Sequence, residues 1–207
     1  VGGDFYWFSR HGLNYLAGVI DCTGHGVPGA FMTVIAYAVL SRIINDETAL
    51  NPALLLNTMN KHVRSMLKQH TAENGHSDDG LDASFCLIKP REQKVIFSGA
   101  KQALFHTWSG EIAEVKGDRQ SIGYASSDES FEYTNHFIDI QHGFKDMSID
   151  GEGHILGKKQ FRQLLSSLGG KSMQEQHQYL TQIMDKSLDQ NEQHDDITIF
   201  AFKLPDK

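Results

Sequence analysis

Residues 15–30 read YLAGVIDCTGHGVPGA, an apolar run that ends at Asp21 and passes into a glycine-rich loop. Apolar and β-branched residues bounded by turn residues are typical of a strand, so we predict a strand over Tyr15–Ile20. Asp4–Phe8 is rich in aromatic residues and precedes it across a turn at Arg10–Gly12. If the two strands pair through that turn, the start of the first lies beside the end of the second.

The flanking segments predict helices. Ala30–Ile44 is apolar, contains neither Gly nor Pro and is long for a strand, which favours a buried helix. Asn51-Pro52 is a typical helix start, because asparagine caps the end and proline fits the first turn. Late in the chain we predict a helix over Gly157–Leu168 and another from Ser172, where Ser172 and Glu175 form a capping box.

The middle of the chain predicts strands separated by short turns. The candidates are Ala83–Ile88, Lys94–Ser98, Ala103–Trp108, Glu111–Val115 and Phe131–Ile140, with Ile197–Phe202 as the last strand. The strands and helices are segregated along the chain, which indicates an α+β fold rather than a βαβ alternation. We expect a single domain over residues 1–207, and the abrupt start suggests a piece excised from a longer regulatory protein.

Composition excludes several classes of function. The 207 residues carry 19 Lys and Arg against 26 Asp and Glu, a net charge of −7, and 40% are hydrophobic. Such a chain can bury a core, but it lacks the basic cluster that binds nucleic acid. The longest apolar run, Gly29–Leu40, is shorter than the roughly 20 residues that cross a bilayer, so we expect no direct membrane insertion. Two cysteines without a disulfide pattern indicate a cytoplasmic domain, although its parent could be membrane-anchored.

The loop Gly24–Gly29 matches the dinucleotide-binding pattern G-x-G-x-x-G, and Asp46-Glu47 lies at about the distance expected of its ribose-binding acid. Two observations count against an NAD-dependent oxidoreductase. The charge of Asp21 would repel a pyrophosphate, and nothing before Asp46 can form the required second parallel strand. The oxidoreductase is therefore the function that the sequence supports least.

The aspartates offer a different chemistry. Asp4 begins one predicted strand and Asp21 ends the next, so pairing brings both carboxylates to one end of a sheet. Asp195-Asp196 precedes the last strand. Mg²⁺ and Mn²⁺ prefer carboxylate and carbonyl oxygens, which aspartates at strand ends beside glycines supply. Any single loop aspartate is more simply explained as a turn former, but the combination favours a metal site.

Six motifs follow one another along the chain: Val1–Trp7, Gly18–Ala30, Asp79–Asp82, Phe97–Ala100, Gly117–Tyr124 and Asp195–Thr198. Together, in this order, they resemble the metal-dependent protein phosphatases (PPM, type 2C-like), and among them the bacterial branch named after sporulation stage II protein E. The resemblance covers nearly the whole chain. It implies a two-layer antiparallel β-sandwich flanked by helix pairs, with a two-metal site for Mn²⁺ or Mg²⁺ at one end. It also implies hydrolysis of phosphoserine and phosphothreonine.

The same resemblance assigns roles to individual residues. Asp4 and Asp21 would bind metal, with Asp21 bridging two ions, and the backbone carbonyl of Cys22 would complete the second site. Asp195 would bind the first metal. The ions would activate a water that attacks phosphorus directly. The substrate implied is a phosphorylated STAS-type (anti-anti-sigma-like) protein, and homodimerisation is left open.

One position of the family pattern differs in our interpretation. The family has an Asp-Gly pair after a hydrophobic strand, which supplies a further ligand to the first metal. We place His142 there, because it follows the apolar stretch Phe137–Ile140 and precedes Gly143. Imidazole is a poor ligand for Mg²⁺ and adds no negative charge, so we expect weakened metal binding. The alternative to an active phosphatase is therefore a pseudophosphatase that serves as a binding module.

Overall fold

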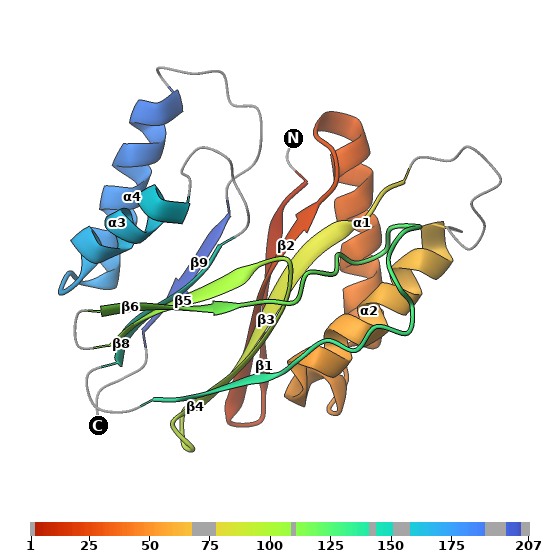
Figure 1. Cartoon of the computed structure of the whole chain (residues 1–207), viewed down its shortest axis with the longest axis horizontal. Helices are drawn as coiled ribbons and strands as arrows, with labels where there is room; N and C mark the ends of the chain where they lie inside the picture. The colour runs from red at the N-terminus through yellow and green to blue at the C-terminus, as the bar shows by residue number, and fades with distance from the viewer. Residues whose placement is uncertain are drawn as a thin grey trace.

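The structure is a computed structural model, and it describes residues 3–67, 78–108, 111–140, 144–150, 158–188 and 198–203. Two antiparallel sheets stack face to face (Figure 1). The strands of the first sheet, in spatial order, are β1 (Phe5–His11), β2 (Asn14–Cys22), β3 (Leu81–Lys89), β4 (Lys94–Ala100) and β7 (His136–Asp139). Those of the second sheet are β6 (Glu111–Lys116), β5 (Ala103–Trp108), β8 (Phe144–Asp150) and β9 (Ile199–Phe202).

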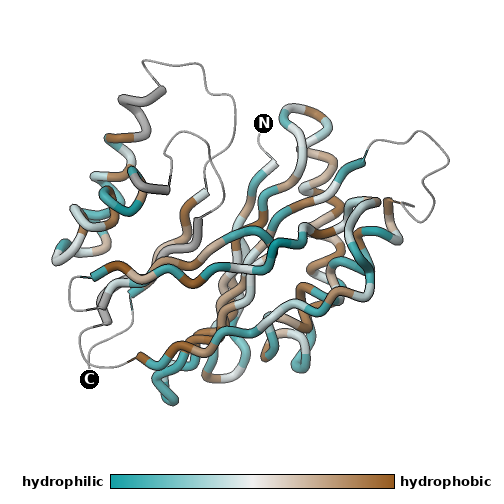
Figure 2. The backbone as a smooth tube through the Cα atoms, viewed as in Figure 1, coloured by the Kyte–Doolittle hydropathy of each residue, from teal (hydrophilic) through white to brown (hydrophobic). Residues whose placement is uncertain are grey.

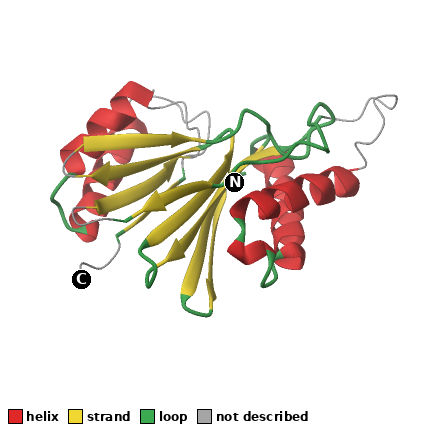
Figure 3. Cartoon of the chain, turned by 60° about the horizontal axis from the view of Figure 1, so that its bottom comes forward, coloured by secondary structure: helices red, strands yellow, loops and turns green. Residues whose placement is uncertain are grey.

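A pair of helices covers the outer face of each sheet (Figure 3). The first pair packs on β2 and β3, and the second pair packs on the sheet that contains β5. The predicted α+β sandwich flanked by helix pairs is therefore confirmed. The helices are α1 (Gly26–Ile43), α2 (Pro52–Leu67), α3 (Lys158–Leu168) and α4 (Met173–Leu188), with a short 3₁₀ helix at Thr48–Leu50.

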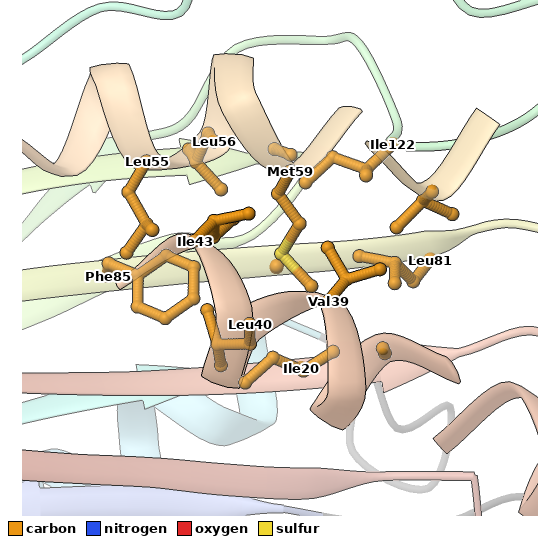
Figure 4. Packing of buried hydrophobic residues seen from close by; sticks show 14 of the residues in the cluster. Ile20, Val39, Leu40, Ile43, Leu55, Leu56, Met59, Leu81, Phe85 and Ile122 are labelled. Atoms are coloured by element: carbon orange, nitrogen blue, oxygen red, sulfur yellow. The ribbon is translucent and has the colours of Figure 1, made fainter. Parts of the chain in front are cut away.

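Strand alternation divides the apolar residues between two layers of core. On β2, Ile20 lies beneath the helices and packs with Leu40 and Met59 (Figure 4). Its neighbour Val19 faces the other way and packs with Phe97 between the two sheets. Successive side chains of a strand point to opposite faces, so alternate residues of β2 belong to alternate layers of the core.

Helix α1 is more apolar than the other helices, and hydrophobic residues recur along it (Figure 2). It begins at Gly26, four residues earlier than predicted, because Val27, Pro28 and Gly29 form its first turn, where proline is well tolerated. By length and composition α1 would be able to cross a membrane, which corrects the shorter estimate from Gly29–Leu40. In this structure Met32, Ala36 and Leu40 bury one side of it against the sheet.

Two helix starts are confirmed at atomic detail. Asn51 accepts a hydrogen bond from the amide of Leu54 at 3.2 Å, as a helix cap does. At α4, Glu175 accepts from the amide of Ser172 at 2.7 Å, and the amide of Glu175 donates to Ser172 Oγ at 3.3 Å. These reciprocal bonds are the predicted capping box.

The region before α3 differs most from prediction. The strand expected over Phe131–Ile140 is limited to β7. Residues 131–135 do not join the sheet, because this segment is hydrogen-bonded to α2: the side chain of Asn57 accepts from the amide of Tyr133 at 3.0 Å. The following strand, β8, was not predicted. It pairs with both β5 and β9, so it is a central strand of the second sheet.

Candidate metal centre

Three aspartates lie in a row across neighbouring strands. In the β1–β2 pair Phe5 is opposite Ile20, so Asp4, one residue earlier, is level with Asp21. In the β2–β3 pair Asp21 is directly opposite Asp82. The predicted pairing of the first two strands is thus confirmed, and β3 adds a third carboxylate.

The three carboxylates also share one face of the sheet. Ile20 and Cys22, on either side of Asp21, belong to the core beneath the helices. Phe5, next to Asp4, and Leu81 and Ala83, on either side of Asp82, lie in or against the same core. By strand alternation, all three aspartates face the second sheet, at the end of the sandwich where β2 ends and β3 begins.

The charges of this row act on neighbouring groups. The pKa of the Cys22 thiol is raised to about 12, first by burial and then by the charges of Asp21 and Asp4. The pKa of Tyr124 is raised, chiefly by burial, with further contributions from Asp82 and Asp21. Asp21 influences both groups, which is consistent with its place in the middle of the row.

This donor set fits a hard divalent cation. Like charges directly opposite one another destabilise a sheet, and a bound cation removes that penalty. Carboxylate oxygens are the ligands that Mg²⁺ and Mn²⁺ prefer. Within the described part of the chain, no three acidic, His or Cys side chains already form a cluster that could hold an ion. The strand pairing thus sets the three aspartates in one row without gathering their carboxylates into such a cluster.

Cys22 can take part only through its backbone. Its side chain is 4% exposed, lies in the core beneath the helices and hydrogen-bonds the side chain of Thr33. Its carbonyl oxygen is approached closely by Gly3, where a Cβ would lie only 2.7 Å from that oxygen. Glycine is thus required where the segment before β1 crosses the end of β2.

The glycine-rich loop packs against itself. Gly24 and Gly26 have φ values of +89° and +66°, and a Cβ on Gly29 would lie 2.3 Å from the carbonyl oxygen of Gly24. These close approaches explain the glycine spacing without a pyrophosphate. Every strand pairing is antiparallel, so the parallel βαβ unit of a dinucleotide-binding fold is absent from the described residues.

Thr23 ties this loop to distant parts of the chain. Its amide donates to the carbonyl of Gly80 at 3.0 Å, and its hydroxyl donates to the same oxygen at 2.8 Å. The hydroxyls of Thr23 and Tyr124 are 2.5 Å apart. A Cβ on Gly80 would collide with the Tyr124 ring at 2.2 Å. Three segments are therefore locked together beside the row of aspartates.

His142 and Asp195 lie outside the described residues. The strands that flank His142 are described, however. β7 ends with Asp139 opposite Lys94, and β8 begins with Phe144 opposite Trp108. Both positions are at the end of their sheets away from Asp21.

The other end of β8 lies where β5 and β9 begin. Asp150, its last residue, is paired with Ala103 at the start of β5 and with Ile199 at the start of β9. Asp150 is followed by Gly151, so the chain does contain an Asp-Gly pair after a strand. Sequence reasoning missed this aspartate because it missed the strand, and it gave Asp82 no role because the β2–β3 pairing is not local.

The comparisons with known proteins agree with this geometry. A family model described as Stage II sporulation protein E (SpoIIE) matches residues 12–205. The SiaA-PP2C domain of Pseudomonas aeruginosa is similar in structure, with a TM-score of 0.85 and 29% identity over 99% of this chain and 81% of that chain. Among curated protein sequences, none matches.

Two more distant structures share the fold. RsbX in complex with magnesium has a TM-score of 0.65 and 15% identity, over 99% of this chain and 88% of that chain. The serine/threonine phosphatase Stp1 from Staphylococcus aureus has a TM-score of 0.66 and 14% identity, over 100% and 90%. Because the family model spans nearly the whole chain and the sandwich agrees with these structures, the chain belongs to the SpoIIE family of PPM-type, metal-dependent serine/threonine phosphatases.

Proposed function

We propose that this domain hydrolyses phosphoserine or phosphothreonine on a regulatory protein in a metal-dependent reaction. The observation that carries the proposal is the row of Asp4, Asp21 and Asp82 across three strands at one end of the sandwich. Family membership supports the reaction class. The partner, by the family resemblance, is a phosphorylated STAS-type protein.

Asp4, Asp21, Asp195 and the carbonyl of Cys22 would hold Mn²⁺ or Mg²⁺ in this proposal. When bound, such ions lower the pKa of a water and neutralise phosphoryl oxygens. The chain itself fixes the donors: Asp21 has a neighbouring carboxylate on each side, and Gly3 lets the first segment reach the Cys22 carbonyl. The buried thiol, protonated at neutral pH, stays out of the reaction.

We further propose that Asp150, rather than His142, supplies the remaining carboxylate of the first metal. It satisfies the Asp-Gly pattern, and its pairing with Ala103 supports the proposal, because Ala103 comes three residues after Ala100, which is opposite Ala83, the neighbour of Asp82. The metal-binding role of His142 stays a prediction, and we favour Asp150 because β7, which precedes His142, ends with Asp139 opposite Lys94, away from Asp21. A carboxylate at Asp150 favours an active phosphatase over a pseudophosphatase, because the ligand set then has its full negative charge.

Calorimetric titration with Mn²⁺, together with hydrolysis of p-nitrophenyl phosphate, tests both proposals. Asp21→Asn and Asp150→Asn each remove a charged ligand, so we expect Mn²⁺ affinity to fall by about 10- to 100-fold and hydrolysis to be lost. His142→Ala should change neither. Asp46→Asn, at an exposed turn after α1, is the matched control.

The outcomes separate the hypotheses. A wild-type chain that binds Mn²⁺ but hydrolyses nothing, and gains activity only as His142→Asp, would restore the pseudophosphatase. Equal Mn²⁺ affinity in wild type and Asp150→Asn would exclude Asp150 as a ligand. No Mn²⁺ binding at all would overturn the metal-dependent function.

A further inference from the structure

A polar pocket lies beside the carboxylate row, past the end of β4. Its volume is about 280 Å³, and its walls include Lys101 and the segment 119–127, with Arg119, Ser121, Tyr124 and Ser126 among the lining residues. Tyr124 connects the pocket to the row, because its hydroxyl contacts Thr23, two residues after Asp21. The pocket is therefore adjacent to the proposed active site but separate from its metal ligands.

The charge of this pocket is opposite to that of its surroundings. The chain has a net charge of −7, and the neighbouring row is acidic. The pocket nevertheless presents the ammonium of Lys101 and the guanidinium of Arg119. Within the described residues, neither side chain forms an ion pair or a hydrogen bond, and the same holds for the hydroxyls of Ser121 and Ser126. These are unused donors that converge on one space.

The walls of the pocket are held rigidly. Arg64, in the last turn of α2, donates to the carbonyls of Tyr124 and Ala125 at 3.1 and 3.3 Å and also to that of Ser127. The Ser127 hydroxyl donates to the carbonyl of Ser121 at 2.8 Å. The backbone that carries Ser121 and Ser126 is therefore fixed, and a ligand has to order only side chains when it binds.

The backbone of Lys101 is fixed as well. Its amide donates to the carbonyl of Asp118 at 2.8 Å, and its φ of +65° belongs to a tight turn between the two sheets. Ala100 is opposite Ala83, so the next residue, Lys101, starts about level with Asp82. Both cations are thus carried on segments whose main chain is hydrogen-bonded in place.

Strand spacing gives the separation between this pocket and the row. Asp21 is on β2, and Lys101 follows β4, two strands away. Neighbouring strands are about 4.8 Å apart, which gives about 10 Å, the length of about three residues of an extended peptide. If the phosphorylated residue of a substrate lies at Asp21, a residue about three positions away in the substrate chain therefore reaches the pocket with its side chain.

We propose that this pocket binds the carboxylate of an acidic residue in the substrate, about three residues from the phosphorylated serine or threonine. Lys and Arg together with hydroxyl donors are the groups that bind carboxylates. The inference rests on the proposed phosphatase function and specifies its substrate: a phosphorylated segment with an acidic neighbour. Free phosphate released as product shares the anionic chemistry and is the alternative occupant.

Matched phosphoserine peptides test the proposal in the presence of Mn²⁺. Each peptide carries Glu or Gln three residues before or after the phosphoserine. We expect wild type to prefer one Glu peptide over its Gln partner by about tenfold in kcat/KM, as two solvent-exposed ion pairs together supply. The Lys101→Gln/Arg119→Gln double variant should lose that preference. Lys94→Gln, an exposed lysine at the opposite end of β4, should retain it. An equal preference in wild type and double variant overturns the proposal.

A binding measurement without metal keeps this test independent of turnover. Unphosphorylated Glu and Gln peptides are titrated into the ¹⁵N-labelled chain, and the amide shifts of Ser121 and Ser126 are followed. We expect shifts with the Glu peptide, smaller shifts with the Gln peptide and none in the double variant. If no peptide is hydrolysed, the phosphatase function fails while this measurement still decides the pocket. Shifts caused by inorganic phosphate alone, at the same residues and lower concentration, overturn the substrate subsite.

Discussion

Single residues at the end of the sheet decide whether the proposed centre can form. Gly3 is the clearest case, because the space for its missing side chain is filled by backbone atoms. A Cβ there would lie 2.7 Å from the Cys22 carbonyl oxygen and 3.0 Å from that of Gly24. Backbone oxygens cannot rotate away as a flexible side chain would, so any larger residue must displace the segment before β1.

Gly3→Ala should therefore move Asp4 relative to Asp21 and weaken Mn²⁺ binding by about tenfold, a loss near 1.4 kcal/mol. Calorimetric titration measures the change. Gly12→Asn is the matched control: its φ of +62° is tolerated by asparagine, and no atom lies within 4 Å of a Cβ there. Unchanged affinity in Gly3→Ala would show that the close contact does not position the first ligand.

At the level of secondary-structure elements, the sequence predicted much of the fold because local patterns determine it. The β1–β2 hairpin, the start of α2 and the capping box of α4 follow from turn and cap residues, and all are confirmed. β8 was missed because Phe144–Asp150 mixes charged and apolar residues without a clear period. That omission moved the search for an Asp-Gly pair from Asp150 to His142. The pairing of β2 with β3, which brings Asp82 to the row, depends on long-range packing that no local pattern encodes.

Arg64 links α2 to the segment that carries Tyr124. Its guanidinium donates to the carbonyls of Tyr124, Ala125 and Ser127, and the first of these also accepts from the Ser127 amide. Arg64→Gln should cost about 1–3 kcal/mol, because hydrogen bonds from a charged donor to partly buried carbonyls are lost. Urea unfolding measures this cost, and Lys61→Gln, an exposed position on the same helix, should change stability by less than about 0.5 kcal/mol. Equal unfolding midpoints for the two variants would contradict the role of Arg64.

For the molecule as a whole, the buried thiols and a buried tyrosine hydroxyl predict how the free energy of unfolding depends on pH. Burial raises the pKa of Cys22 to about 12 from an ordinary value of 9.0, and it also raises the pKa values of Cys86 and Tyr133. The folded state therefore holds these protons more tightly than the unfolded chain does. Their contribution to stability is complete below about pH 9 and is lost progressively as pH rises toward the folded pKa values.

Urea unfolding at a series of pH values should show a free energy of unfolding that declines steadily above about pH 9. In Cys86→Ala that decline should be less steep, because one of the responsible thiols has been removed. The substitution also lowers stability at neutral pH, so the comparison concerns the slope rather than the midpoint. Parallel slopes in the two proteins would mean that other groups cause the alkaline loss.

The row of aspartates has a consequence for folding fidelity. Side chains alternate along β2, so a slip of one residue against β1 would turn Asp21 toward the helices and bring the Cys22 thiol to the open end. In a mispaired chain, a cation would meet a sulfur atom and apolar groups in place of carboxylate oxygens. Divalent ions would then bind only correctly aligned molecules, and their presence during refolding would enrich the native pairing over its near neighbours.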